Sequence, residues 1–557
     1  MKNFRDRYLQ YGIKLDDFQE EAIAALLADN DVLVSAPTGS GKTLIAEFAV
    51  DLALARELRC IYTAPIKALS NQKYRELSAR CGSKNVGLLT GDLTINRNAE
   101  ILVVTTEVLR NMLFAQDASL ENIGYVVLDE VHYLADKSRG PVWEELILQL
   151  PPAIRLVSLS ATIENLDEFT AWLRSVRGET RCVVSKVRPV PLEQVLLSHG
   201  KVIPLLRGAN LLLGSAAKEN DGADTLAQFN QDLIFAAISR EKHNFGNQEK
   251  TRNRSGRRIS PAQRKKIALQ LRETGLLPAI EFIFSRKGCD NAVKDLLDRE
   301  VIFTTREQQK IIRQRLSELR KTLSEEDCKA VRFGLWEKAL VRGFAAHHAG
   351  MFPAIKELVE ELTAAGLLSV IYATGTLSLG INMPVRSVVL EELYKWNGES
   401  FENLSGTEYT QLIGRAGRRG KDQKGTAVIL ARPHTDLAQL QDLSSGKLEQ
   451  LNSAFFPAYN TVINLIANYG YTKARLIMGT SFAQYQLNSQ LGQIQGKISR
   501  IQAKIARMQH EVNNLCHCGD LAGYLELRNR AGRAAKAARK KHGQNTIVKF
   551  NLLGAIL

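Results

Sequence analysis

The residues from 32 to 43 have the types and spacing of a loop that binds phosphate. They read V-L-V-S-A-P-T-G-S-G-K-T, and an amphipathic run, L-I-A-E-F-A-V, follows at 44–50. Glycines in such a loop let backbone N–H groups close around an anion at the N-terminus of the next helix. Lys42 can reach the β- and γ-phosphates of a nucleotide, and the Thr43 hydroxyl can hold Mg²⁺. The residues predicted to bind nucleotide here are Thr38, Gly39, Ser40, Gly41, Lys42 and Thr43.

A second apolar run, at 125–128, ends in the carboxylates of Asp129 and Glu130, within the sequence D-E-V-H. Asp129 is placed to hold Mg²⁺, and Glu130 to orient and deprotonate an attacking water. An isolated acidic pair is more often a solvated strand end. A phosphate-binding loop upstream makes the catalytic interpretation the better one.

Arginines far along the chain could complete such a site. Residues 411–420 read Q-L-I-G-R-A-G-R-R-G. Arginines at i and i+3 fall on one face of a helix, and a guanidinium matches the geometry of phosphate oxygens. We expect Arg415 and Arg418 to reach the γ-phosphate across a cleft. Arg418 is the favoured arginine finger, and Gln411 is expected in the same site.

The length and charge of the chain limit how the domains that carry these residues can be organised. At 557 residues the chain is too long for one core, so we expect several domains. Lysine and arginine number 74 against 59 acidic residues, and the net charge of +15 indicates a polyanionic partner, either nucleic acid or anionic lipid. No stretch resembles a signal peptide or a membrane span, which predicts a soluble, cytoplasmic protein.

The run at 60–74, C-I-Y-T-A-P-I-K-A-L-S-N-Q-K-Y, together with the phosphate-binding loop, resembles the superkiller-like DExH-box helicases of helicase superfamily two. Ala36 in place of the first loop glycine is usual in helicases. The resemblance implies an α/β fold with two tandem RecA-like parallel-sheet domains. It implies ATP and Mg²⁺ as cofactors and RNA as partner, for a monomeric motor that moves 3′ to 5′ on single-stranded RNA and unwinds duplexes. A nuclease or RNA-decay complex would be a further partner in RNA processing or decay.

The resemblance also assigns residues to roles. Gln19 would read the adenine edge with its amide, and Gly380 and Asn382 would lie on the nucleotide side. Coupling of hydrolysis to strand movement is expected from His132, Ser160 and Thr162, the two hydroxyls bonding to the acidic motif. Nucleic-acid contacts are expected from Pro65, Lys67, Asn71, Thr90, Gly91, Thr105, Thr106, Ser285, Arg286, Thr374 and Thr376.

We expect four regions. Residues 1–185 and 186–434 would be the RecA-like domains, the second with a basic insertion at about 200–270. Residues 435–486 would be winged-helix-like and 487–557 a coiled-coil hairpin that begins a stalk or arch. The hairpin rests on a heptad seam of Leu487, Leu491, Ile494, Ile498, Ile501, Ile505, Met508, Val512 and Leu515.

Two segments keep open interpretations. The basic stretch 240–266 is expected to be flexible, either a solvated linker or an auxiliary RNA-binding arm. The stretch 389–408 would hold a hairpin that splits the duplex, with Tyr394 and Trp396 as wedge or stacking residues or, equally, as core aromatics.

Other functions are compatible with parts of this sequence. A 3′ to 5′ DNA helicase in repair would carry the same motifs. A non-catalytic RNA-binding scaffold would not need Lys42, Asp129, Glu130, Arg415 and Arg418 together. A membrane-surface role suits the charge but lacks an amphipathic anchor.

Overall fold

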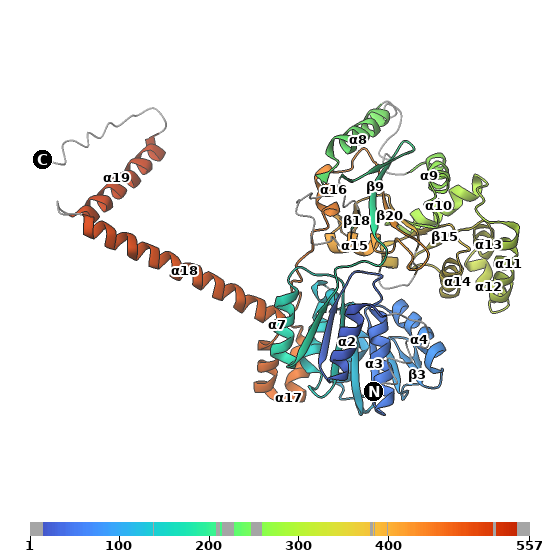
Figure 1. The fold of residues 1–557 in the computed structure, drawn as a ribbon, viewed down its shortest axis with the longest axis horizontal. Helices are drawn as coiled ribbons and strands as arrows, with labels where there is room; N and C mark the ends of the chain where they lie inside the picture. Colours follow the sequence, from blue (N-terminus) through green and yellow to red (C-terminus); the bar gives the residue numbers. More distant parts are fainter. Residues whose placement is uncertain are drawn as a thin grey trace. The chain divides into compact units, whose positions relative to one another are not determined.

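The structure is a computed structural model that describes residues 15–137, 139–207, 212–213, 228–246, 259–378, 383, 385–397, 399–515 and 520–542. The chain divides into two compact units, Met1–Ala483 and Gln484–Leu557. Figure 1 shows two sheets with their helices in the first unit and two long helices near the C-terminus.

The first sheet is built from residues 31–184 and has the strand order β4-β3-β5-β2-β6-β7-β1-β8. Its strands pair in parallel except for β3 with β4, and β1 and β5 are buried along their whole length, as expected for a parallel sheet covered on both faces. The strands are β1 (Asp31–Ser35), β2 (Arg59–Ala64), β3 (Val86–Leu89), β4 (Thr94–Ile95), β5 (Ile101–Thr105), β6 (Ile123–Leu128), β7 (Arg155–Ser160) and β8 (Thr180–Val184).

Helices alternate with these strands. Figure 1 shows α2, α3 and α4 together at one face of the sheet, and α3 packs on β2 and β6. The helical elements are α2 (Asp17–Leu27), α3 (Thr43–Ala55), α4 (Lys67–Cys81), α5 (Thr106–Phe114), η1 (Ala118–Leu120), η2 (Val131–Ala135), α6 (Gly140–Gln149) and α7 (Leu166–Arg177).

The second sheet has the order β10-β9-β20-β17-β14-β16-β15, with β12 also on β9. It is parallel from β15 to β9, and β10 and β12 run antiparallel to β9. Its strands are β9 (Leu192–Ser198), β10 (Lys201–Pro204), β12 (Leu212–Leu213), β14 (Ala279–Phe282), β15 (Phe344–His347), β16 (Val370–Ala373), β17 (Ser387–Leu390) and β20 (Gly425–Leu430). Two short pairs stand apart, β11 (Leu206–Arg207) with β13 (Gln228–Phe229), and β18 (Tyr394–Trp396) with β19 (Phe401–Asn403).

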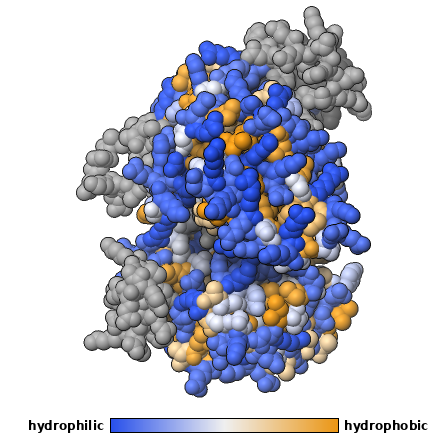
Figure 2. Space-filling model, turned by 90° about the vertical axis from the view of Figure 1, so that its right-hand side faces the viewer, coloured by the Kyte–Doolittle hydropathy of each residue, from blue (hydrophilic) through white to orange (hydrophobic). Residues whose placement is uncertain are grey.

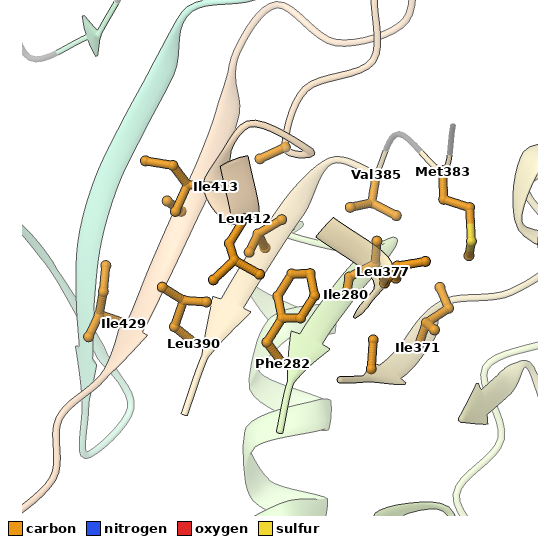
Figure 3. Close-up of a cluster of buried hydrophobic side chains, with 14 of the residues drawn as sticks. Ile280, Phe282, Ile371, Leu377, Met383, Val385, Leu390, Leu412, Ile413 and Ile429 are labelled. Carbon is orange, nitrogen blue, oxygen red and sulfur yellow. The ribbon is translucent and has the colours of Figure 1, made fainter. Parts of the chain in front are cut away.

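The helical elements around this sheet are α8 (Gln231–Gly246), α9 (Pro261–Glu273), α10 (Arg286–Asp298), α11 (Arg306–Arg320), α12 (Glu325–Ala330), α13 (Phe333–Val341), α14 (Pro353–Ala364), η4 (Gly375–Ser378), α15 (Gly406–Ile413) and α16 (Leu437–Ser444). Figure 3 shows Leu412 and Ile413 of α15 pointing toward strands that carry Phe282, Leu390 and Ile429, all in one buried cluster. The core therefore fixes the inner face of α15. The predicted pair of tandem RecA-like α/β domains is confirmed.

Both domains lie in the first unit, and one side of this unit has a mostly hydrophilic surface. Figure 2 shows mostly hydrophilic side chains on the face that holds α11 to α14 and α4, with a narrowing between the upper and lower parts. Arg75 of α4 pairs there with Glu357 and Glu360 of α14, at 3.2 and 3.6 Å. Exposed ion pairs of this kind contribute little stability, about 0–1 kcal/mol each.

The prediction that residues 240–266 are flexible is wrong at both ends of this stretch, which are helical. Helix α8 continues to Gly246, and α9 begins at Pro261 after a capping box between Ser260 and Gln263. Arg264 is 4 % exposed and pairs with the buried Glu281 and Glu391, which raises the pKa of its guanidinium although burial opposes this. Arg264 is thus a core residue rather than part of a solvated arm, and residues 247–258 lie outside the described part of the chain.

The secondary-structure elements within residues 435–486 are all helices. They are α16, α17 (Tyr459–Gly479, kinked at Gly470) and the start of α18 (Phe482–Leu515). This stretch, all of it described, contains no strand, and its assignment as a winged-helix-like region stays a prediction. The segment packs on the first domain, where the Trp172 indole donates to Thr480 O at 2.8 Å and Thr461 binds Glu145.

The second unit contains the rest of α18 and α19 (Leu521–His542). The helix predicted over the heptad seam is confirmed. Its described seam residues, Leu487 to Met508, are 41–62 % exposed. The antiparallel hairpin, in which a second helix covers this seam, therefore stays a prediction. Among the described residues, none of the helices combines the length and apolarity needed to cross a bilayer.

Candidate functional site

The phosphate-binding loop has the backbone that its glycines allow. It runs from the end of β1 to the start of α3, with φ of 82° at Gly39 and 94° at Gly41. Lys42 Nζ donates to the carbonyls of Ala36 and Pro37 at 2.6 and 3.1 Å. The Ser40 hydroxyl is buried and has no hydrogen-bond partner among the described residues. A buried donor without a partner is costly, so this loop fits an anionic ligand that would accept from it.

Gln19 braces the loop from α2. Its amide nitrogen donates to Gly41 O at 3.0 Å, and its amide oxygen accepts from Asp16 N at 3.0 Å. A Cβ at Gly41 would lie 2.8 Å from the Gln19 Nε2 atom, so only glycine permits this approach. Reading of adenine by Gln19 stays a prediction.

The acidic pair lies at the end of β6. Tyr62 donates to Asp129 Oδ2 at 2.7 Å, and the Glu130 amide donates to Asp129 Oδ1 at 2.9 Å. Glu130 has φ 54° and ψ 45°, a left-handed conformation that is uncommon outside glycine and is often found at functional sites. Burial raises the pKa of Asp129, and the charge of Glu130 raises it further.

The nucleotide residues of both domains line one cavity of about 680 Å³. Burial lowers the pKa of Lys42, while the negative charges of Glu130 and Asp129 oppose this. The lining includes Gln19, Thr38, Gly39, Gly41, Lys42, Thr43, Asp129, Glu130, Arg415 and Arg419. The cavity therefore combines the phosphate loop and acidic pair of one domain with arginines of the other.

The structure places the two predicted arginines differently, and the role of Arg418 as the favoured finger stays a prediction. Arg415 is 9 % exposed and faces Glu130. Burial lowers the pKa of the Arg415 guanidinium, and the negative charge of Glu130 raises it. Arg418 does not line the cavity. Its Nε and Nη2 atoms bind Asp422 at 2.7 and 2.8 Å, which holds the pKa of that carboxyl far below its usual value. The reason is that α15 ends at Ile413 and Gly417 has φ 93°, so helical spacing does not apply to the later arginines.

Arg419 is a site residue that sequence reasoning missed. Its Nη2 atom lies 3.0 and 3.1 Å from the two Asp16 carboxylate oxygens, and its Nη1 atom donates to Ser40 O at 3.3 Å. The only signal in the sequence is a third arginine beside the two expected ones.

His132 connects the acidic motif to the second domain. Its Nδ1 atom accepts from the Ala161 amide at 3.2 Å, and its Nε2 atom lies 2.5 Å from the side-chain amide of Gln411. Burial, aided by the charge of Lys42, lowers the pKa of His132 to about 3. The ring is therefore neutral near pH 7. Tyr133 donates to the same Gln411 side chain at 3.2 Å.

The predicted hydrogen bond from the Ser160 hydroxyl to the acidic motif is not made in the described structure, and the coupling role of Thr162 stays a prediction. The Ser160 hydroxyl is buried and finds no hydrogen-bond partner in the described structure, and it is the backbone amide of Ala161 that binds His132. Thr162 lines a second cavity, of about 620 Å³, that also includes His132, Gln411 and Trp396. The link from this strand to the acidic motif thus runs through the backbone.

The predicted nucleic-acid residues lie just beyond strand ends. Lys67 and Thr90 both bind Asp92, which brings two of the predicted loops together. Thr374 and Thr376 hydroxyls lie 2.9 Å apart and line the second cavity. The others are Pro65 after β2, Asn71 on α4, Gly91 after β3, Thr105 and Thr106 at the β5–α5 junction, and Ser285 and Arg286 at the start of α10. Carboxyl ends of parallel strands form one edge of a sheet, where ligands of α/β proteins bind.

Two predicted residues cannot be placed, because Gly380 and Asn382 lie outside the described residues. The predicted hairpin is present as β18 and β19. Trp396 and Phe401 are 51 % and 56 % exposed, with ring centroids 5.1 Å apart, while the Tyr394 hydroxyl lies 3.1 Å from His434 Nε2. Trp396 is therefore not a core residue, and a role as wedge or stacking residue stays a prediction.

The donor set suits a magnesium ion bound mainly through phosphate and water. Thr43 and Asp129 line the same cavity, and within the described residues no group of three or more His, Cys, Asp or Glu is arranged so that it could hold a metal ion by itself. Mg²⁺ takes oxygen ligands and commonly uses only one or two protein groups beside nucleotide phosphates.

Two protein-family models match the chain. The DEAD/DEAH box helicase model matches residues 16–169, and the helicase conserved C-terminal domain model matches residues 298–420. The first match spans β1 to β7 of the first sheet, and the second spans β15, β16 and β17 of the second sheet.

Three curated relatives illustrate the similarity. The chain is 46 % identical over 486 residues to "Probable helicase HelY" of Mycobacterium tuberculosis, which covers 86 % of this chain and 52 % of that protein. It is 37 % identical over 491 residues to "DExH-box ATP-dependent RNA helicase DExH10" of Arabidopsis thaliana, covering 87 % and 48 %. It is 36 % identical over 479 residues to "Exosome RNA helicase MTR4" of Homo sapiens, covering 86 % and 44 %. The chain spans about half the length of the curated relatives it matches.

Proposed function

This chain belongs to the superkiller-like DExH-box helicases of helicase superfamily two, and we propose from that premise that it is an ATP-dependent RNA helicase. It hydrolyses ATP to move along single-stranded RNA, 3′ to 5′, and to unwind RNA duplexes in RNA processing or decay. The observation that carries the proposal is the single cavity in which Lys42, Glu130 and Arg415 converge from two domains. A scaffold would not need these three groups to meet.

The residues of the cavity divide the work of phosphoryl transfer. Lys42 and the loop amides hold the phosphates, and Glu130 orients the attacking water and accepts its proton. Arg415 stabilises the charge that develops on the γ-phosphate; such an arginine contributes roughly 10³- to 10⁵-fold in other systems. Thr43 and Asp129 would hold Mg²⁺, which would supply further neutralisation of phosphate charge when bound.

His132 and Gln411 couple this chemistry to the nucleic acid. Both residues line the second cavity together with Thr374 and Thr376, and His132 lies two residues after Glu130 of the nucleotide cavity. A change in Glu130 or Arg415 on hydrolysis therefore reaches residues that would hold the RNA backbone. Alternate gripping by the two domains then advances the strand.

Three features support RNA as the substrate and a decay complex as a partner. The names of DExH10 and MTR4 both contain the words RNA helicase, and the name of MTR4 also contains the word exosome. The chain has a net charge of +15, which suits a polyanion. The HelY name states no nucleic acid, so DNA is the alternative that the experiment must separate.

The test is duplex unwinding by this chain with ATP at one fixed salt concentration, because nucleic-acid binding depends steeply on salt. Four matched duplexes carry a 3′ or a 5′ overhang, in RNA or in DNA. Unwinding of the RNA duplex with a 3′ overhang, lost in Glu130→Gln, supports the proposal. Preferential unwinding of DNA would overturn the RNA assignment, and equal activity of the Glu130→Gln variant would overturn the catalytic one.

A further inference from the structure

Residues 449–451, which we call the interdomain strap, follow α16 and bind to the first domain. Glu164 N donates to Glu449 O at 3.1 Å, and Leu451 N donates to Asn165 Oδ1 at 2.7 Å. The Asn165 amide returns a hydrogen bond to Leu451 O at 3.1 Å, and Leu451 is 2 % exposed. Three hydrogen bonds thus fasten the strap just beyond the S-A-T segment that ends β7.

The same strap holds the N-terminus of α15 in the second domain. Glu449 Oε1 accepts from Gly406 N at 2.6 Å, and Glu449 Oε2 accepts from the Thr407 hydroxyl at 2.5 Å. A carboxylate at this end satisfies a free backbone N–H and is favoured by the helix dipole. A Cβ at Gly406 would lie 3.2 Å from Glu449 Oε1, so the glycine makes room for the carboxylate.

The element that Glu449 holds carries the second domain's share of the ATP site. Helix α15 has eight residues, among them Gln411, and Arg415 follows its end directly. Ser405 and Glu408 already form a capping box at the same terminus. The capping box satisfies Ser405 N and Glu408 N, whereas Gly406 N is satisfied by Glu449, whose carboxylate also ties the helix to another part of the fold.

These contacts close a ring around the second cavity. His132 binds the Ala161 amide on one side and the Gln411 side chain on the other. The strap joins the segment after Ala161 to the start of the helix that bears Gln411. Glu449 also lines the cavity that the ring surrounds.

We propose that Glu449 is a positioning residue that sets the place of α15, and through it of Gln411 and Arg415, relative to the S-A-T segment of the first domain. The proposal rests on the proposed function, because it assigns Glu449 to ATP turnover through α15. Misplacement of a reacting group by about 1 Å can cost on the order of 10²-fold in rate. Loss of the Glu449 carboxylate would remove both hydrogen bonds from the strap to the N-terminus of this short helix and allow such a shift.

The test compares Glu449→Ala with Glu449→Gln and with Gln450→Ala as the matched control. Glutamine at 449 keeps both contacts, because its oxygen can accept from Gly406 N and its amide can donate to the Thr407 hydroxyl. Gln450 is a neighbouring exposed residue of the same strap. Each variant is measured for kcat and KM of RNA-stimulated ATP hydrolysis and for hydrogen exchange of the α15 amides.

We expect Glu449→Ala to lower kcat about tenfold with KM changed less than about twofold, and to speed exchange in α15. Glu449→Gln should keep most of the kcat, and Gln450→Ala should match the wild type. Wild-type kcat in Glu449→Ala, or an equal loss in all three variants, would overturn the assignment. If the wild type shows no RNA-stimulated turnover, the proposed function fails, and hydrogen exchange still decides whether Glu449 holds α15.

Discussion

The two domains contribute to the ATP site in different ways. In the first domain, Asp129 and Glu130 directly follow β6, and Lys42 directly precedes α3, after the loop that leaves β1; both strands are almost fully buried. In the second domain, Arg415 lies beyond the end of α15, where the polypeptide is held by side chains from elsewhere. Arg188, for example, donates to Gly414 O at 2.9 Å. The first half of the site is built by its own strands and the second by its neighbours.

This difference suggests which half adjusts during a cycle. Groups at the ends of central strands cannot move without moving the core, since interiors are densely packed. A residue after a short helix moves when the contacts of that helix change. We therefore assign the binding of phosphate to the rigid half and the response to RNA to the half that contains α15.

The largest expected effect separates Arg415 from Arg418, two arginines of the half that contains α15, which we call the adjustable half. Arg415→Ala should lower kcat by about 10³-fold, because Arg415 faces Glu130 in the cavity. Arg418→Ala should lower kcat by less than about tenfold, because its guanidinium is bound to Asp422 outside the cavity. Steady-state ATPase measurements at saturating RNA compare the two. A larger loss for Arg418→Ala would show that the comparison has the arginines reversed.

The next effect concerns the contact between the halves. Gln411→Ala removes the partner of His132 and Tyr133. We expect RNA stimulation of ATP turnover to fall about tenfold while ATP hydrolysis without RNA stays within about twofold. The matched control is Gln439→Ala, whose amide donates to Leu393 O in the same domain away from the interface. Loss of hydrolysis without RNA in Gln411→Ala would place Gln411 in the chemistry rather than in the coupling.

A pH effect should appear in the rigid half, at His132. The pKa of His132 in the folded protein is about 3 because the ring is buried, whereas the ordinary value is 6.5. The unfolded segment therefore binds a proton more readily between these values, so stability is full above about pH 6.5 and falls as the pH decreases. Lowering the pH from 7.5 to 5.5 should cost η2 on the order of 1 kcal/mol.

Native-state hydrogen exchange of residues 131–135 measures this cost, after correction for the intrinsic pH dependence of exchange. The variant His132→Gln, which does not titrate in this range, is the reference. A wild-type protein that loses no more stability than His132→Gln would show that the histidine is not held neutral by burial.

The smallest effect concerns Arg419, which reaches from the adjustable half to the rigid half. Arg419→Ala removes the ion pair to Asp16 and the hydrogen bond to Ser40 O. Because this ion pair is half-exposed, we expect KM for ATP to rise about threefold with little change in kcat. Asp16→Asn should reproduce part of the rise. An unchanged KM in both variants would remove Arg419 from the nucleotide site.

The same contrast explains how much the sequence could predict. The phosphate loop and acidic pair were predicted because strand, loop and helix follow one another within a few residues, and their geometry is local. The expectation that Arg418 lies beside Arg415 extended helical spacing past Ile413, where α15 ends. Gly414 and Gly417 are local signals of a helix end that this expectation did not use.

Two other differences come from long-range contacts. Arg264 looked like part of a basic linker, but its partners Glu281 and Glu391 lie 17 and 127 positions away. The Ser160 hydroxyl was expected to bind the acidic motif, but the neighbouring Ala161 amide takes His132 instead. Tertiary packing, which pattern analysis does not contain, decides both cases.

The central claim is that one ATP site is shared by the two domains, with Glu130 and Arg415 acting together. The most direct test is single-turnover ATP hydrolysis with saturating RNA by the wild type, Glu130→Gln, Arg415→Ala and the double variant. Groups that act as a unit are strongly non-additive. We expect each single variant to lose at least about 10²-fold and the double variant to be no more than about threefold slower than the slower single variant. Independent, multiplying losses, or wild-type turnover in Arg415→Ala, would contradict a shared site.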